Sequence, residues 1–143
     1  MQFELRSLTI SFLIHSTEDE LGLIHSVSRA FQIDEDAIEV SSLEGHYGNE
    51  LKFAKAHVTG KRASEIAMSA ISGVPSSERK TTASILETFM DEHDALYLRV
   101  DRQKLPFISL QGEEEPIRLK LKPKNRFKNR SEMLDWYSQV LRK

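Results

Sequence analysis

Alternation of apolar and polar side chains predicts half-buried β-strands along much of the chain. Within residues 5–14, Leu8, Ile10, Phe12 and Ile14 share one face, and mainly hydroxyl side chains occupy the other. The same alternation, or a shorter apolar run, predicts four more strands at residues 37–43, 51–58, 95–101 and 117–122.

The third of these strands has an irregular pattern. Leu51 and Phe53 are in one phase, whereas Ala54, Ala56 and Val58 are in the other. A β-bulge would bring both sets onto one face, because a bulge adds one residue and shifts the alternation.

Apolar residues at intervals of three and four predict four helices. They are expected at about residues 17–31, at 61–72, from Ser76 or Ser77 to Met90, and from Ser131 onward. Thr17 followed by Glu20 matches a capping box, and Ser131 is expected to cap the last helix. The apolar stripe of the second helix consists largely of alanine, so this helix is expected to lie close to the sheet.

The predicted order of elements is β α β β α α β β α. Short connections and alternating strands favour a largely antiparallel sheet with helices packed on one face, because buried parallel strands would be almost continuously apolar. The fold class is therefore α+β. The chain has 143 residues, 39% hydrophobic and 29% charged, which suits one globular domain over residues 1–143.

The composition excludes several classes of protein. There is no cysteine, which excludes disulfides, thiol catalysis and cysteine-ligated zinc. No apolar run reaches the ~18 residues of a membrane span, and the alternating N-terminal pattern is unlike a signal peptide. We therefore expect a cytoplasmic protein without a membrane partner.

Motifs typical of enzymes are also missing. The sequence has no phosphate-binding glycine loop, no serine-nucleophile elbow and no metal-ligand spacing among its histidines. Its acidic clusters fall at helix starts or in turns, where capping explains them. We therefore expect no catalytic residue, no cofactor and no metal site, and a metal-dependent hydrolase ranks last among the hypotheses.

The formal net charge of −2 hides an asymmetry. Residues 1–114 carry 11 basic and 19 acidic side chains, whereas residues 115–143 carry 9 basic and 3 acidic ones. A basic segment on an acidic body favours a polyanionic partner.

The last predicted strand is the most informative basic element. Its Arg118, Lys120 and Lys122 share a face at intervals of roughly 6.5–7 Å, close to the phosphate spacing of an extended nucleic acid. Lys124 and Arg126 extend the positive path beyond the strand. The alternative is a solvated outer face whose lysines protect a sheet edge.

Neighbouring strands favour binding over that alternative. If one face of the sheet is open, Tyr97 and Arg99 share it with Ser7, Thr9 and Ser11. An aromatic ring beside guanidinium groups suits stacking on unpaired bases. Alternatively, Tyr97 packs beneath the aliphatic stems of the lysines.

Three parts of the chain carry a family resemblance. The first strand-to-helix junction is IHSTEDE at residues 14–20, the predicted hairpin is LEGHYGN at 43–49, and the last two strands contain LYLRVDRQ at 96–103 and IRLKLK at 117–122. In this order, over about residues 5–122, the chain resembles a small archaeal family described as RNA-binding proteins and predicted exosome subunits. The resemblance implies RNA binding and a fold similar to the large-subunit ribosomal protein that holds the small ribosomal RNA.

The resemblance also marks candidate residues by position and implies no catalytic ones. The motif positions in the hairpin and after the fourth strand are His46, Tyr47, Gly48 and Asn49, then Arg99, Asp101, Arg102 and Gln103. Arg102 stands where the family often has lysine, which preserves the charge.

The leading hypothesis is a non-catalytic RNA-binding protein, linked to RNA processing by an exosome or to ribosome biogenesis. Its specificity should be modest, because phosphate contacts carry little sequence information. The candidate RNA-binding residues are His46, Tyr47, Asn49, Tyr97, Arg99, Arg102, Arg118, Lys120, Lys122, Lys124 and Arg126. The alternative is a protein-interaction or homodimerisation module, in which Tyr97 and the apolar patch from Phe107 to Leu110 form the interface.

Overall fold

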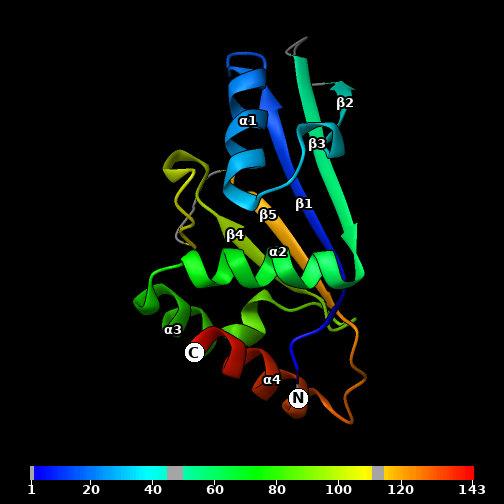
Figure 1. Ribbon diagram of the computed structural model, residues 1–143, viewed down its shortest axis with the longest axis vertical. Coiled ribbons are helices and arrows are strands. Elements are labelled where there is room, and N and C mark those ends of the chain that lie inside the picture. Colours follow the sequence, from blue (N-terminus) through cyan, green and yellow to red (C-terminus); the bar gives the residue numbers. More distant parts are fainter. Residues whose placement is uncertain (1, 45–49, 111–114) are drawn as a thin grey trace.

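The fold is organised around one antiparallel β-sheet (Figure 1). The computed structural model describes residues 2–44, 50–110 and 115–143. The strands are β1 (Leu5–His15), β2 (Glu39–Glu44), β3 (Glu50–Thr59), β4 (Leu96–Val100) and β5 (Ile117–Pro123). They pair in the order β2-β3-β1-β5-β4. The predicted α+β class and its antiparallel sheet are confirmed.

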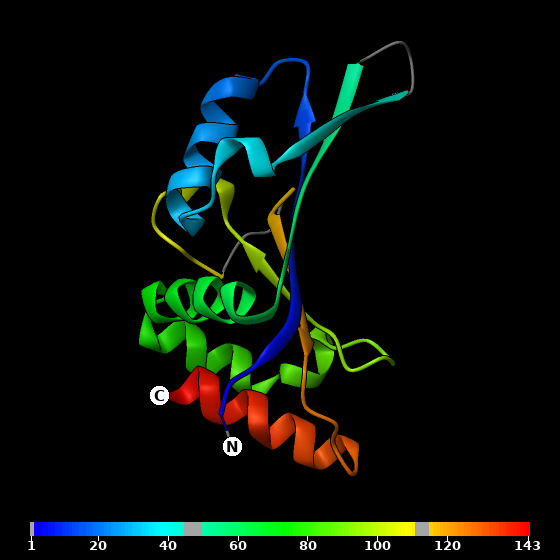
Figure 2. The ribbon, with the colours of Figure 1, turned by 45° about the vertical axis from the view of Figure 1, so that its right-hand side comes forward.

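The α-helices lie toward one side of this sheet. The helices are α1 (Glu20–Phe31), α2 (Gly60–Gly73), α3 (Ser76–Ser84) and α4 (Arg130–Arg142), with short 3-10 helices η1 (Glu35–Ala37), η3 (Leu86–Phe89) and η4 (Arg102–Lys104). Figure 2 shows α1 and α2 along one face, with α3 and α4 packed together toward the end that holds the N-terminus. Along the described chain, no helix is long and apolar enough to cross a membrane.

The inner face of β1 forms the centre of the core. Leu8, Ile10, Phe12 and Ile14 are buried, as their alternation predicted. α2 packs against β1 with a stripe made mostly of alanine, so its backbone can approach the sheet closely. The buried residues of this stripe are Ala63, Ile66, Ala67, Ala70 and Ile71.

β3 is regular, so the predicted bulge is wrong. Its pairing with β1 runs without a shift from the Ser7–Thr59 pair to the His15–Leu51 pair. Leu51 and Phe53 therefore lie on the face opposite Ala54 and Ala56, which are buried under the helices. The assumption that every apolar residue of a strand faces the core is what fails here.

The helix starts differ from the sequence prediction. α1 is capped by Asp19, whose carboxylate accepts a hydrogen bond from the Gly22 amide, and not by Thr17. The glutamate that reaches back to a preceding amide is Glu18, which accepts from the His15 amide at 2.9 Å. The turn at residues 15–18 therefore delays the helix by a few residues relative to the predicted start.

The third helix is shorter than predicted. α3 ends at Ser84, and the chain continues through η3 with Leu86 buried. Ile85, which lies between α3 and η3, is 48% exposed. The change from an α-helix to a 3-10 helix rotates this side chain away from the core.

α4 begins one residue earlier than predicted, and its cap is Asn129 and not Ser131. The Asn129 side chain accepts a hydrogen bond from the Glu132 amide at 2.9 Å. This helix buries both Trp136 and Tyr137.

We expect Asn129→Ala to lower the free energy of unfolding by about 1 kcal/mol, because it leaves an amide of the first turn of α4 without its cap. Ser131→Ala should change the free energy of unfolding by much less, since the cap hydrogen bond of α4 is accepted by Asn129 and not by Ser131. Urea denaturation of both variants measures the difference. A larger loss for Ser131→Ala would contradict the assigned cap.

Candidate nucleic-acid interface

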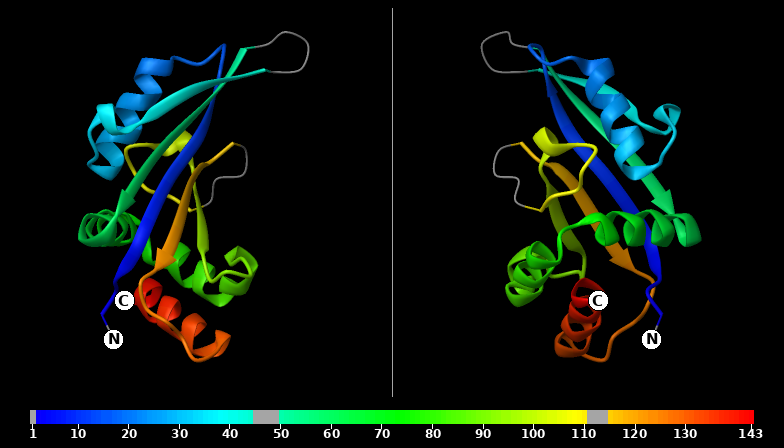
Figure 3. Two further views of the ribbon diagram at one scale, coloured as in Figure 1. Left: turned by 90° about the vertical axis from the view of Figure 1, so that its right-hand side faces the viewer. Right: turned by 60° about the vertical axis from the view of Figure 1, so that its left-hand side comes forward.

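The sheet face opposite the helices carries a cluster of basic side chains, which we call the basic face. It is formed by the outward residues Lys55 of β3, Arg118, Lys120 and Lys122 of β5, and Tyr97 and Arg99 of β4. Figure 3 shows α1 and α2 on one side of these strands, so the basic face and the core that these helices cover lie on opposite sides of the sheet. Sequence alternation correctly grouped the β5 and β4 residues and missed Lys55.

Strand register arranges the basic face in rows. One row crosses four strands through Lys55, Ser11, Arg118 and Arg99, and Glu39 on the edge strand β2 ends it. Because adjacent strands are about 4.8 Å apart, the backbone positions of Lys55 and Arg118 are separated by roughly 10 Å. The row therefore places positive charge across the whole middle of the sheet.

A second row runs parallel to it. His57, Thr9, Lys120 and Tyr97 follow one another across β3, β1, β5 and β4. The Thr9 hydroxyl lies 2.9 Å from Nδ1 of His57, so these two side chains are joined across β1 and β3. Below this row, Lys122 lies opposite Ser7.

Several cations of the basic face have no acidic partner. Among the residues that the structure describes, Lys55, Arg118 and Lys122 form no ion pair, although all three are exposed. By contrast, Lys52 on the helix side of β3 donates to Glu20 at 2.7 Å, which raises the pKa of Lys52. The open face thus concentrates unneutralised charge.

Tyr97 is held in place from two sides. Its hydroxyl donates to Asp91 at 3.1 Å, and Nζ of Lys120 lies 5.5 Å from the ring centroid in a cation–π contact. Partial burial raises the pKa of Asp91, but hydrogen bonds from the Ala95 and His93 amides and from Tyr97 outweigh it, and the pKa lies below its usual range. The tyrosine ring therefore has a fixed orientation on the basic face.

The Arg102 side chain is buried in an ion pair with Glu18. It is 7% exposed, and Nη1 contacts both carboxylate oxygens of Glu18, at 3.0 and 2.8 Å. Partial burial raises the pKa of Glu18, but the His15 amide and Arg102 outweigh this and lower it. These contacts fix the η4 turn, which Asp101 caps by accepting from the Gln103 amide.

Two further residues, His15 and Glu115, lie beside this ion pair. His15, Glu18 and Glu115 have ligand-type atoms within 4.8 Å of one another, and Nε2 of His15 lies 2.5 Å from a Glu115 oxygen. The Arg102 guanidinium already occupies Glu18, so the geometry describes an ion-pair cluster. His15 and Glu18 are three residues apart, but Glu115 comes from a distant segment, so no local spacing pattern could have grouped all three.

The remaining predicted site residues are distributed more widely. His46, Tyr47, Gly48 and Asn49 lie outside the described residues. Lys124 is exposed, and its Nζ lies 4.0 Å from Oε2 of Glu4. Arg126 is exposed beyond β5, in the segment whose Phe127 packs on Trp136.

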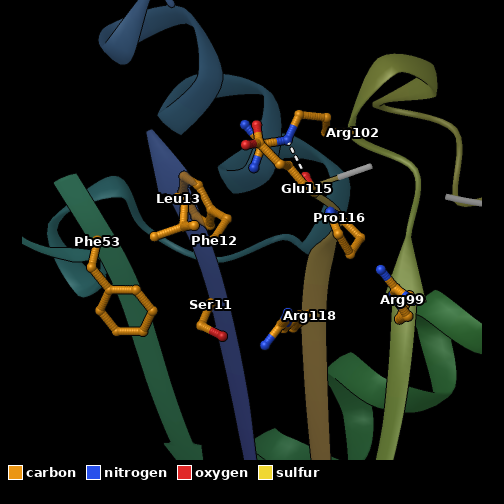
Figure 4. A pocket seen from close by; sticks show the side chains of 9 residues that line it. All are labelled: Ser11, Phe12, Leu13, Phe53, Arg99, Arg102, Glu115, Pro116 and Arg118. Carbon is orange, nitrogen blue, oxygen red and sulfur yellow. Dashed lines mark hydrogen bonds between the residues drawn. The ribbon is translucent and has the colours of Figure 1, made fainter. Parts of the chain in front are cut away.

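A hollow of about 250 Å³ adjoins the basic face where β5 begins (Figure 4). Its walls include Leu13 of β1, Phe53 of β3 and Pro116, and its rim includes Arg99 and Arg118. Phe53 was not predicted here because a bulge was expected to bring it onto the same face as Ala54 and Ala56. The out-of-phase position of Phe53 was the available signal.

The family of the protein is shown by its sequence. The chain matches, over residues 7–122, the model of a family described as RNA binding, and because this match spans most of the chain, the protein belongs to that family. An uncharacterized protein of Methanocaldococcus jannaschii is 28% identical over 105 residues, which are 70% of each chain.

Solved structures of archaeal proteins share the fold. A protein from Archaeoglobus fulgidus superimposes with a TM-score of 0.78 at 24% identity, covering 95% of this chain and 99% of that one. A DUF54 protein from Methanothermobacter thermautotrophicus gives a TM-score of 0.77 at 21% identity, covering 96% and 98%. These similarities confirm the architecture of sheet and helices.

Proposed function

We propose that the protein is a non-catalytic RNA-binding protein that binds RNA on its basic face. The observation that carries the proposal is the row of exposed cations on the open side of the sheet, which includes Lys55 and Arg118 without acidic partners among the described residues. Membership of a family described as RNA binding supports it.

Phosphate contacts dominate this mode of binding. The β5 cations follow one another at roughly 6.5–7 Å, so each can contact a different phosphate of an extended strand. Tyr97, fixed by Asp91, offers a ring edge or face beside Lys120. Arg102 holds the chain before β5 in place, because its Nε donates a hydrogen bond to the Glu115 carbonyl while its Nη1 pairs with Glu18.

The family resemblance of the sequence supports a proposal for the cellular role. We assign the protein to RNA processing, as an accessory factor linked to an exosome, or to ribosome biogenesis. Capture of RNA after ultraviolet crosslinking in the native cells, followed by sequencing, distinguishes the two. Enrichment of ribosomal RNA precursors favours biogenesis, and enrichment of diverse 3′ ends favours processing.

RNA binding should weaken steeply with salt. Four phosphate contacts by the basic face predict a slope of about −3 in a plot of log affinity against log salt for a single strand. Between 50 and 200 mM salt the affinity should therefore fall by roughly fiftyfold. Filter binding or fluorescence anisotropy measures this, and no binding to single-stranded or structured RNA at low salt would reject the proposal.

The loop after η4 leaves little of the apolar interface that the homodimerisation alternative predicted. Ile108 and Ser109 are buried in the protomer, so the predicted interface patch is reduced largely to Phe107, which is 78% exposed. Light scattering after size exclusion tests this alternative. An obligate dimer whose interface covers Arg118 and Lys120 would favour it over RNA binding.

A further inference from the structure

The hollow beside the basic face arises from a step in the sheet. The paired register of β1 with β5 ends at Ser11 and Arg118, while the pairing of β1 with β3 continues to His15. The next outward residue of β1, Leu13, therefore has Phe53 as its paired neighbour on one side only. A recess opens on the other side, and Figure 4 shows it between the strands.

Phe53 is unusual for an aromatic residue in this fold. It is half-buried, yet it lies outside the hydrophobic core, and no other ring of the described chain packs on it. Leu13 is its cross-strand neighbour on β1, and both side chains line the recess. An accessible aromatic face on a cationic surface suits stacking with a flat, uncharged group attached to an anion.

The rim of the recess supplies the matching polar groups. The Arg118 guanidinium lies at its mouth without an acidic partner among the described residues, and the Ser11 hydroxyl lies beside it. The volume of about 250 Å³ is below the roughly 300–1,000 Å³ of pockets for drug-sized ligands. The recess therefore suits a single planar ring system.

We propose that this recess binds one unpaired RNA base, stacked on Phe53, while Arg118 contacts the adjacent phosphate. The inference deepens the proposed function and rests on it. Bases in an RNA duplex are stacked and paired, so they cannot enter the recess, and the protein should prefer single-stranded or looped RNA. Stacking tolerates any base, so this preference adds no strong sequence specificity.

The test compares three RNAs by fluorescence anisotropy at one salt concentration. They are a single-stranded oligouridine of about ten nucleotides, within the site size of such grooves, a duplex of equal length, and an abasic strand with the same phosphates. The single strand should bind about tenfold or more tightly than the abasic strand, because one base stacks on an aromatic ring. This comparison needs no substitution.

Phe53→Leu should remove that advantage and leave binding to the abasic strand and the duplex unchanged. Phe107→Leu is the matched control, since Phe107 is exposed and does not line the recess, and it should leave binding to all three RNAs unchanged. Circular dichroism confirms that both variants fold.

The outcomes separate this inference from the proposed function. If the protein binds RNA but does not distinguish the normal strand from the abasic strand, the base pocket is rejected and RNA binding stands. An equal loss of affinity of Phe53→Leu for all three RNAs would also reject the pocket, because Phe53 would then support the sheet. A dimer that Phe53→Leu dissociates would assign the recess to a second copy of this chain. No RNA binding by the unmodified protein rejects both proposals.

Discussion

Simultaneous Arg118→Glu and Lys120→Glu substitutions are expected to weaken RNA binding by more than about a hundredfold. At about 0.1 M salt each phosphate contact to a single strand contributes roughly fivefold, so the loss of two contacts accounts for about twenty-fivefold. The rest comes from repulsion, because the new carboxylates would stand beside the phosphates. The salt slope should fall from about −3 to roughly −1.5.

The matched control reverses the same number of charges on the helix side. Arg29 of α1 and Lys80 of α3 are exposed and lie outside the basic face, so Arg29→Glu with Lys80→Glu changes the net charge equally. This control should keep most of the affinity. An equal loss in both double variants would show that net charge, and not the basic face, determines binding.

Arg102→Met is expected to lower the free energy of unfolding by about 2–3 kcal/mol. Removal of one partner of a buried ion pair costs roughly 3–5 kcal/mol because it leaves an uncompensated charge. The cost is reduced here because Glu18 keeps some exposure to solvent. Gln103→Met, at an exposed neighbouring position, is the control and should change the free energy of unfolding much less.

The pH dependence of this loss has a defined sign. The folded-state pKa of Glu18 is lowered, so the pair stabilises the fold fully above the unfolded-state pKa of a glutamate. This contribution is lost as pH falls through the lowered folded-state pKa. The difference between the protein and Arg102→Met should therefore be full at pH 7 and shrink below about pH 4. If the difference in free energy of unfolding stays constant in acid, the destabilisation of Arg102→Met comes from lost packing of the aliphatic part of the arginine side chain.

Strands and helices whose side-chain pattern depends only on residues nearby in the chain were predicted correctly from the sequence. β1 and β5 follow from alternation, and the β5 pattern also identified Arg118 and Lys120 on one open face. The alanine stripe of α2 predicted its close packing for the same reason. In each case neighbours within a few residues determine which way a side chain points.

The features that depend on distant partners could not be predicted. Arg102 was a candidate RNA contact until the structure placed it against Glu18, 84 residues away in the chain. The apolar Phe53 was assigned to the core, although strand register places it with Lys55 on the open face. The residue that caps α1 depends on the turn at residues 15–18. There the Glu18 carboxylate accepts a hydrogen bond from the His15 amide before the helix begins.

The central position of β1 has a consequence for synthesis of the protein. β1 emerges from the ribosome first, but its partner β5 is separated from it by most of the chain, whereas β3 follows much sooner. Strand pairings between distant parts of the chain form late, because the entropy cost of closing a long loop comes before the pairing can stabilise the fold. The nascent chain can thus assemble β1, α1, β3 and α2 while the cations of β5 are still missing from the sheet. The basic face is then complete only after translation of β5, so under the proposed function the unfinished chain is expected to bind RNA less tightly.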